Sequence, residues 1–130
     1  MKLAWCRQVA LIVAGFAAKD TAEIYSPPYL FKGKRPKITA APAQLGWGEQ
    51  FEISTHVRDA RRAVLVAPGA STHAADMHKR LVPLTLRSRS KQGLGLISPP
   101  DANLAPPGYY MLFALAKGGV PSKAQWVRLG

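Results

Sequence analysis

The sequence predicts an all-β fold in which two sheets pack as a sandwich. Glycine and proline are frequent, at 11 residues each in a chain of 130, which disfavours a helical bundle and suits short strands joined by turns. Strand-like segments recur at roughly ten-residue intervals, and no useful length of sequence has the helical period. Hydrophobic residues make up 48% of the chain, enough for one domain with its own core and no need of a metal or a disulfide.

Seven strands are expected, separated by turn signals such as Pro68-Gly69 and Pro106-Pro107-Gly108. The second shows the clearest pattern, because Phe51, Ile53, Thr55 and Val57 alternate and therefore share one face. Before the third strand, the polar stretch Arg58–Arg62 is interpreted as a charged connection at one end of the sandwich. The expected strands are Lys37–Ala41, Gln50–Val57, Arg62–Ala67, Leu81–Leu86, Leu94–Ser98, Tyr109–Ala116 and Ala124–Leu129. This number and spacing are typical of a β-sandwich.

The first 36 residues do not follow this pattern. Tyr25–Pro36 is interpreted as a linker, because Pro27 and Pro28 disfavour both helix and central strand, and its aromatic residues are expected to pack against something. The apolar run Val9–Ala18 has two interpretations. With Lys2 and Arg7 before it, the run resembles the core of a signal peptide ending near residue 17. Its β-branched part, Val9–Gly15, also fits a short buried strand.

The net charge of +11 favours acidic partners in general, but the cations are spread along the chain. Only Lys32–Lys37 and Arg87–Lys91 are dense, and neither is interleaved with aromatic residues that could stack on bases. We interpret the charge as a solvated basic surface and expect no specific nucleic-acid site. No stretch reaches the roughly 18 apolar residues of a membrane-spanning helix.

Enzyme motifs are mostly absent: the sequence has no phosphate loop, no nucleophile elbow and no paired-cysteine metal site. The single cysteine, Cys6, cannot form a disulfide within the chain. A long loop from Pro68 to His78 carries His73, and an imidazole there is either a surface group or a ligand for copper or zinc. One histidine cannot hold a metal alone, so such a site needs further ligands.

Several strings, taken in order, resemble the C-terminal domain of the galactose oxidase and glyoxal oxidase family. The resemblance implies an immunoglobulin-like, early-set sandwich at residues 36–130. Residues 1–35 would then be a linker and a remnant of the last Kelch propeller blade, with Val9–Gly15 as a propeller strand in preference to a signal peptide. The strings are Ala22–Leu30, Arg35-Pro36, Ala41-Pro42, Val64–Met77, Arg80–Leu84, Ala105–Phe113, Gly119–Ser122 and Trp126–Arg128.

Members of that family are copper radical oxidases, usually extracellular, which oxidise a primary alcohol or an aldehyde and reduce O2 to hydrogen peroxide. Two tyrosines, one of them crosslinked to a cysteine, and two histidines hold the copper. One histidine comes from the immunoglobulin-like domain, and His73 matches it. The resemblance assigns no catalytic residue here. It places the four tyrosines in structural motifs: Tyr25, Tyr29, Tyr109 and Tyr110.

The sequence also departs from the family pattern. His78 and Lys79 stand where the family has an acidic or amide residue and a glutamine. His78 could be a second metal ligand, but we interpret it as a substitution in the loop. The crosslinked cysteine, both tyrosine ligands and the second histidine have no matching segment, and Cys6 lies outside any such segment. We therefore expect the chain to be inactive alone and to bind copper only with a Kelch propeller, in cis or in trans. The alternative is a non-enzymatic binding module with an immunoglobulin-like fold.

Overall fold

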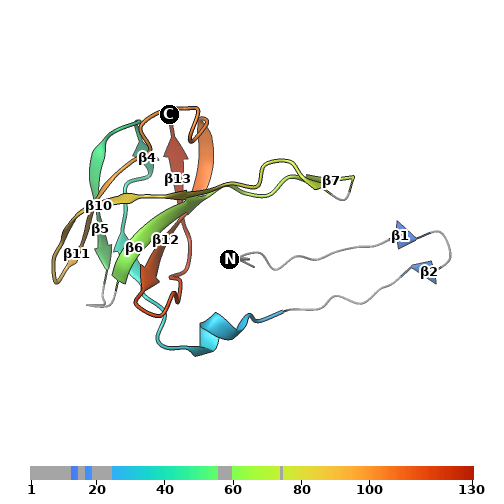
Figure 1. The fold of residues 1–130 in the computed structure, drawn as a ribbon, viewed down its shortest axis with the longest axis horizontal. Helices are drawn as coiled ribbons and strands as arrows, with labels where there is room; N and C mark the ends of the chain where they lie inside the picture. The colour runs from blue at the N-terminus through green and yellow to red at the C-terminus, as the bar shows by residue number, and fades with distance from the viewer. Residues whose placement is uncertain (1–12, 15–16, 19–24, 56–59, 74) are drawn as a thin grey trace.

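Two β-sheets face each other in the body of the protein (Figure 1), in a computed structural model that describes residues 13–14, 17–18, 25–55, 60–73 and 75–130. The four-stranded sheet has the order β10-β11-β5-β3, and the five-stranded sheet has the order β4-β13-β12-β6-β9. The first sheet consists of β3 (Ile38–Ala40), β5 (Gln50–Thr55), β10 (Thr85–Arg89) and β11 (Gly93–Ile97). The second consists of β4 (Gln44–Leu45), β6 (Ala60–Val66), β9 (Leu81–Pro83), β12 (Gly108–Ala116) and β13 (Gln125–Leu129). The predicted all-β sandwich is confirmed.

The core lies between the two sheets and follows from the alternation of the strands. In β5, Phe51, Ile53 and Thr55 are buried and the residues between them are exposed, as the period-two pattern predicts. The four-stranded sheet adds Leu94 and Leu96, and the five-stranded sheet adds Leu65, Tyr110, Leu112, Val127 and Leu129. The Tyr110 hydroxyl donates a hydrogen bond to the Pro106 carbonyl oxygen at 2.8 Å, so this buried ring has a partner for its polar group.

The predicted strand Leu81–Leu86 is divided between the two sheets. Leu81–Leu86 was expected to be continuous, but the chain changes sheets within it: β9 pairs with β6 in one sheet, and β10 pairs with β11 in the other. Leu84, between the two, is buried and its amide donates to the Ala63 carbonyl oxygen at 3.0 Å. Pro83 fits here because β9 is an edge strand and its missing amide leaves no gap inside a sheet.

Three shorter elements differ from the expectations. One strand, β4, was not expected, and it runs parallel to β13. The polar connection ends earlier than expected, because β6 already begins at Ala60. The loop that carries His73 contains two short paired strands, β7 (Ser71–Thr72) and β8 (Ala75–Asp76).

The linker is joined to the sandwich by Arg35. Its guanidinium donates to the carbonyl oxygens of Pro121 and Ser122 at 2.9 and 2.8 Å. Before it, Pro28–Phe31 form one short 3-10 helix (η1). The prolines were expected to disfavour helix, and that expectation was wrong for this short form. Proline suits the first position of such a helix, where its missing amide is not needed. Tyr25 and Phe31 are exposed, contrary to the expected packing.

Near the N-terminus, β1 (Val13–Ala14) pairs antiparallel with β2 (Ala17–Ala18). The rest of the expected strand Val9–Gly15, and Cys6, lie outside the described residues. Within the described part of the chain, no helix has the length and apolar character needed to cross a bilayer.

Candidate functional site

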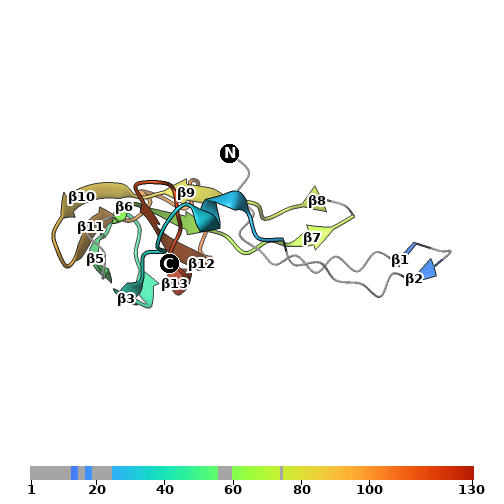
Figure 2. The same ribbon diagram turned by 90° about the horizontal axis from the view of Figure 1, so that it is seen from below.

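A two-stranded ribbon, residues 68–79, continues from β6 and returns into β9; we call it the finger. Figures 1 and 2 both show it projecting from the sandwich. Every described residue from Gly69 to Lys79 in the finger is exposed. The finger therefore starts from two paired strands of the five-stranded sheet and ends away from any core.

Backbone hydrogen bonds and one carboxylate give the finger its shape. At its base the Ala67 amide donates to the Arg80 carbonyl oxygen at 3.0 Å, and farther out the Met77 amide donates to the Ala70 carbonyl oxygen at 3.2 Å. Asp76 Oδ1 accepts from the Ala70 amide at 2.9 Å and from the His78 amide at 3.3 Å. The Asp76 carboxylate thus joins the two strands of the ribbon through its hydrogen bond with the Ala70 amide.

His73 lies at the turn between β7 and β8. The pairs Ser71–Asp76 and Thr72–Ala75 leave only residues 73 and 74 to make the turn, and His73 has a φ of 51°. Two-residue hairpin turns need positive φ, which glycine and asparagine adopt at less cost than other residues. Histidine is one of the few other residues enriched in this left-handed conformation, so His73 suits the turn.

The His73 ring is oriented by its neighbour. Its Nδ1 lies 2.8 Å from the Thr72 hydroxyl oxygen. In the tautomer that carries its proton on Nδ1, the ring donates to that hydroxyl and Nε2 keeps a lone pair on the exposed side. A hydrogen bond that fixes one ring nitrogen while the other is available is the arrangement found in metal-binding histidines.

The other two histidines do not complete a site with His73. His78 Nδ1 lies 3.2 Å from the Pro68 carbonyl oxygen, across the base of the finger, and His56 lies outside the described residues. No group of three or more His, Cys, Asp or Glu side chains in the part of the chain that the structure describes could hold a metal ion. These residues therefore fit copper as the source of one imidazole ligand and not as a whole site.

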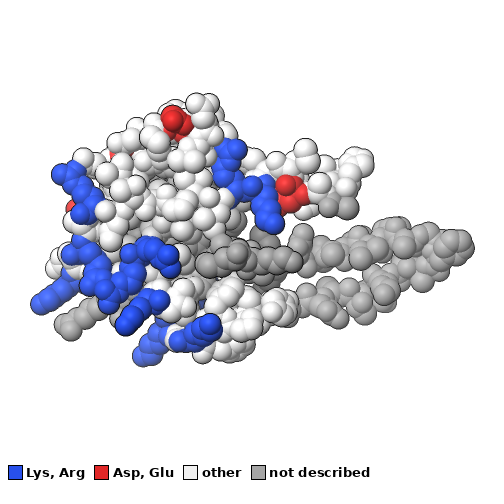
Figure 3. Space-filling view, viewed as in Figure 1, with Lys and Arg blue, Asp and Glu red and all other residues white. Residues whose placement is uncertain are grey.

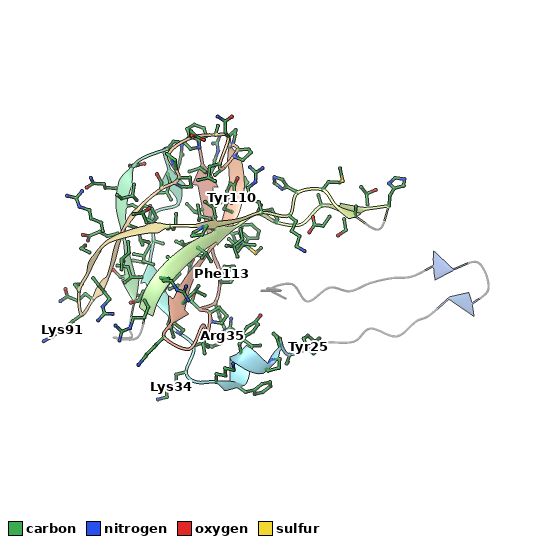
Figure 4. All side chains as sticks on the ribbon, in the orientation of Figure 1. Tyr25, Lys34, Arg35, Lys91, Tyr110 and Phe113 are labelled. Carbon is green, nitrogen blue, oxygen red and sulfur yellow. The ribbon has the colours of Figure 1, made fainter. Side chains whose placement is uncertain are left out.

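The tyrosines lie apart from His73. Tyr110 is in the core, and Tyr109 is exposed at the start of β12. Tyr25 precedes η1, where Figure 4 shows it on the linker, and Tyr29 lies within η1. Burial raises the pKa of Tyr29 above its usual value of 10.0, the positive charge of Arg35 lowers it, and Tyr25 raises it.

An apolar face flanks the finger on the outer side of the five-stranded sheet. Val64, Phe113 and Leu115 form a second buried cluster there, against which Val66, Met111 and Ala124 pack. Figure 4 shows Tyr110 and Phe113, which come from the same strand, and their alternation gives β12 one apolar side toward the core and another away from it. Leu81 and Trp126 are exposed on the same sheet.

At the base of the finger, Arg80 Nη1 is buried and has no hydrogen-bond partner among the described residues.

Comparison with known proteins gives a consistent result. Residues 35–129 match the family model described as the galactose oxidase-like, early set domain. An aldehyde oxidase from Arabidopsis thaliana is 36% identical over 123 residues, covering 82% of this chain and 20% of that protein. A galactose oxidase from Gibberella zeae is 35% identical over 114 residues, covering 83% of this chain and 17% of that protein.

A solved structure of a fungal alcohol oxidase in complex with copper has a TM-score of 0.75 and 31% identity, covering 82% of this chain and 24% of that chain. This chain therefore spans no more than about a quarter of the length of the proteins it resembles.

Proposed function

The chain belongs to the galactose oxidase-like family through an early set domain at residues 35–129, and on this premise we propose that His73 is one ligand of a copper site completed by a separate propeller domain. The observation that carries the proposal is the place of His73, exposed at the turn of a finger that leaves the sandwich, with a positive φ and an oriented ring. Copper is named in the description of the related alcohol oxidase.

Two further features support a missing neighbour on the same side. The register places Trp126, Met111, Val66 and Leu81 in one row across the outer face of the five-stranded sheet, and Trp126 and Leu81 are exposed; neighbouring exposed apolar side chains are typical of interfaces. The buried Arg80 Nη1 lacks an acceptor within the described residues, and a buried donor without an acceptor calls for a partner. We propose that a propeller, supplied in cis or in trans, covers this face and provides the acceptor.

The same proposal assigns the parts of the chain. Residues 36–130 would form the early set domain, and residues 1–35 would be a linker and the remnant of the last propeller blade. Among the residues that the structure describes, no group of three or more His, Cys, Asp or Glu side chains could hold a metal ion, so we propose that the chain does not oxidise an alcohol or an aldehyde without a propeller.

A domain exchange tests the ligand. Residues 25–130 replace the early set domain of the related galactose oxidase, and copper content and peroxide formation from galactose are measured in the chimera. Because a direct ligand is worth at least as much as the residues that orient one, we expect His73→Ala to lower copper affinity by about 100-fold or more. His78→Ala is the matched control and should retain copper. Full copper retention in the His73→Ala chimera would contradict the assignment.

The chain alone tests the second part. With copper supplied, it should form no peroxide from galactose, glyoxal or methylglyoxal. Turnover that disappears in His73→Ala would show that the chain carries a complete site, and the need for a propeller would then be wrong.

A further inference from the structure

The outer face of the four-stranded sheet contains a polar trough that the copper proposal does not use. It has a volume of about 240 Å³ and runs over β11 between β5 and β10. Its walls carry small polar groups from both neighbouring strands and from the β10–β11 turn: Glu52, Ser54, Ser88, Ser90 and Gln92. The trough is below the size range of drug-binding pockets and is of a scale that suits a single sugar residue.

Two glycines create the floor. Gly93 and Gly95 alternate with the buried Leu94 and Leu96, so they face outward without side chains. A Cβ on Gly93 would collide with the Ile53 carbonyl oxygen, and one on Gly95 would collide with the Ser88 hydroxyl. The bare backbone of β11 is therefore required by the close approach of its neighbours, and it leaves a hollow along the sheet.

Cations gather at one end of the sandwich. The register places the end of β5, the start of β6, the end of β12 and the β10–β11 turn together, since Gly93 pairs with Ser54 and Ala116 pairs with Ala60. We call the cations of this region the basic end: Lys34, Arg35, Lys37, Arg61, Arg62, Arg89, Lys91, Lys117 and Lys123. Figure 3 shows Lys and Arg gathered at the lower left, over this end, and Figure 4 places Lys91 there at the tip of the β10–β11 turn.

The described acidic residues lie elsewhere. Glu49 and Asp101 are near the opposite ends of β5 and β11, and Asp76 is in the finger. Glu52 stands in the trough itself. The segregation makes the basic end an attractive surface for a polyanion, and the trough opens beside it through Ser90, Gln92 and Gly93.

We propose that the trough and the basic end together bind an acidic polysaccharide, a chain of sugars that carry carboxylates. Hydroxyl and amide groups in the trough hydrogen-bond the hydroxyls of one sugar, while Lys91 in the β10–β11 turn attracts the carboxylates along the chain. A single-stranded nucleic acid fits less well, because no aromatic side chain lines the trough and bases would find nothing to stack on. The trough lies on a different sheet from the finger, and its binding role does not depend on copper.

The test titrates the full chain with an oligogalacturonide, its fully methyl-esterified form and a single-stranded DNA of equal charge, by calorimetry and by backbone NMR. We expect the oligogalacturonide to bind, to shift the amides of residues 88–95, and to lose affinity as salt rises. The neutral ester should bind much more weakly. DNA binding equal to or tighter than oligogalacturonide binding would overturn the proposal.

Three variants and one control sharpen the result. Lys91→Gln should weaken oligogalacturonide binding by about threefold, as expected for one exposed ion pair. The control, Arg128→Gln on the other sheet, removes an exposed cation far from the trough and should change binding little. Glu52→Gln should strengthen binding, because it removes a like charge from the trough. Ser54→Leu fills the trough and should weaken oligogalacturonide binding but not DNA binding; an equal loss for both ligands would show that the trough has no part in recognition.

Discussion

The finger and the sandwich are stabilised by different kinds of interaction. In the sandwich, alternate residues of β5, β6, β11 and β12 enter one shared core, and residues 112–116 are all buried. In the finger, Gly69–His73 and Ala75–Lys79 are all exposed, and the ribbon is held by backbone hydrogen bonds and by Asp76. The first region is stabilised by burial, and the second by a few polar contacts that water can replace.

Stability and the candidate ligand therefore lie in different parts of the molecule. A segment with few buried apolar contacts opens at low free-energy cost, so the finger is expected to exchange its amides faster than β12. His73 depends on that segment for its position. The outer apolar face and Arg80 lie where the finger begins, so docking of a neighbour there would supply the order that the finger lacks by itself.

The largest contrast is expected from truncating one apolar side chain in each region. Leu112 is fully buried, so Leu112→Ala should lower the free energy of unfolding by about 3 kcal/mol, because it leaves a cavity in the core. Met77 is 75% exposed, so Met77→Ala should change it by less than about 0.5 kcal/mol. Urea unfolding of both variants measures the difference. Equal losses would mean that the finger packs on the sandwich in solution, and the comparison would fail.

A smaller contrast is expected between two hydroxyls. Ser122 is fully buried; its hydroxyl accepts from the Ala114 amide at 3.1 Å and donates to the Lys123 carbonyl oxygen at 2.7 Å. Ser122→Ala leaves that buried amide without this acceptor and should cost about 1–3 kcal/mol.

Thr72→Val is the matched finger variant, because it removes the contact between the Thr72 hydroxyl and His73 at an exposed position. It should leave the free energy of unfolding unchanged within about 0.5 kcal/mol. In the chimera with the galactose oxidase relative, the same variant should lower copper affinity, since it removes the group that orients the ring. A stability loss equal to that of Ser122→Ala would show that the Thr72 contact is structural.

The sequence was sufficient for the sandwich because its strands are long enough to show a pattern. In β5 burial alternates over the whole strand, and β12 ends in five consecutive apolar residues that are all buried. The change of sheet at Leu84 could not be predicted in the same way. Leu81–Leu86 has the composition of one strand, and only its pairing with β6 on one side and β11 on the other shows the switch.

The candidate site was predictable in part. The resemblance singled out His73, and it lies at the finger turn, but its φ of 51° depends on pairs of β7 and β8 too short to leave a sequence pattern. The trough had no signal in the sequence: the expected strand Leu94–Ser98 includes Gly95 but not Gly93, and the role of both glycines comes from Ile53 and Ser88 on adjacent strands. Features that arise between strands depend on which strands become neighbours, and the pattern of a single strand does not show this.

The smallest effect is expected in the linker, which is intermediate between the two regions because Arg35 bonds it to the sandwich. Burial raises the pKa of Tyr29 above 10.0 in the folded chain, with Arg35 opposing the rise. Above the unfolded pKa the unfolded chain releases this proton first, so the folded state holds more protons and the free energy of unfolding falls as pH rises through the folded pKa. Below that range the group has no effect.

Two variants give this effect opposite signs. Tyr29→Phe should make the free energy of unfolding fall less between about pH 8 and about pH 11, because it removes the titrating group. Arg35→Gln should make it fall more, because the charge that stabilises the tyrosinate is gone and the pKa of Tyr29 rises further. Urea unfolding at the two pH values measures both. If Tyr29→Phe left the fall unchanged, Tyr29 would not be buried in solution, and the linker would resemble the finger more than the sandwich.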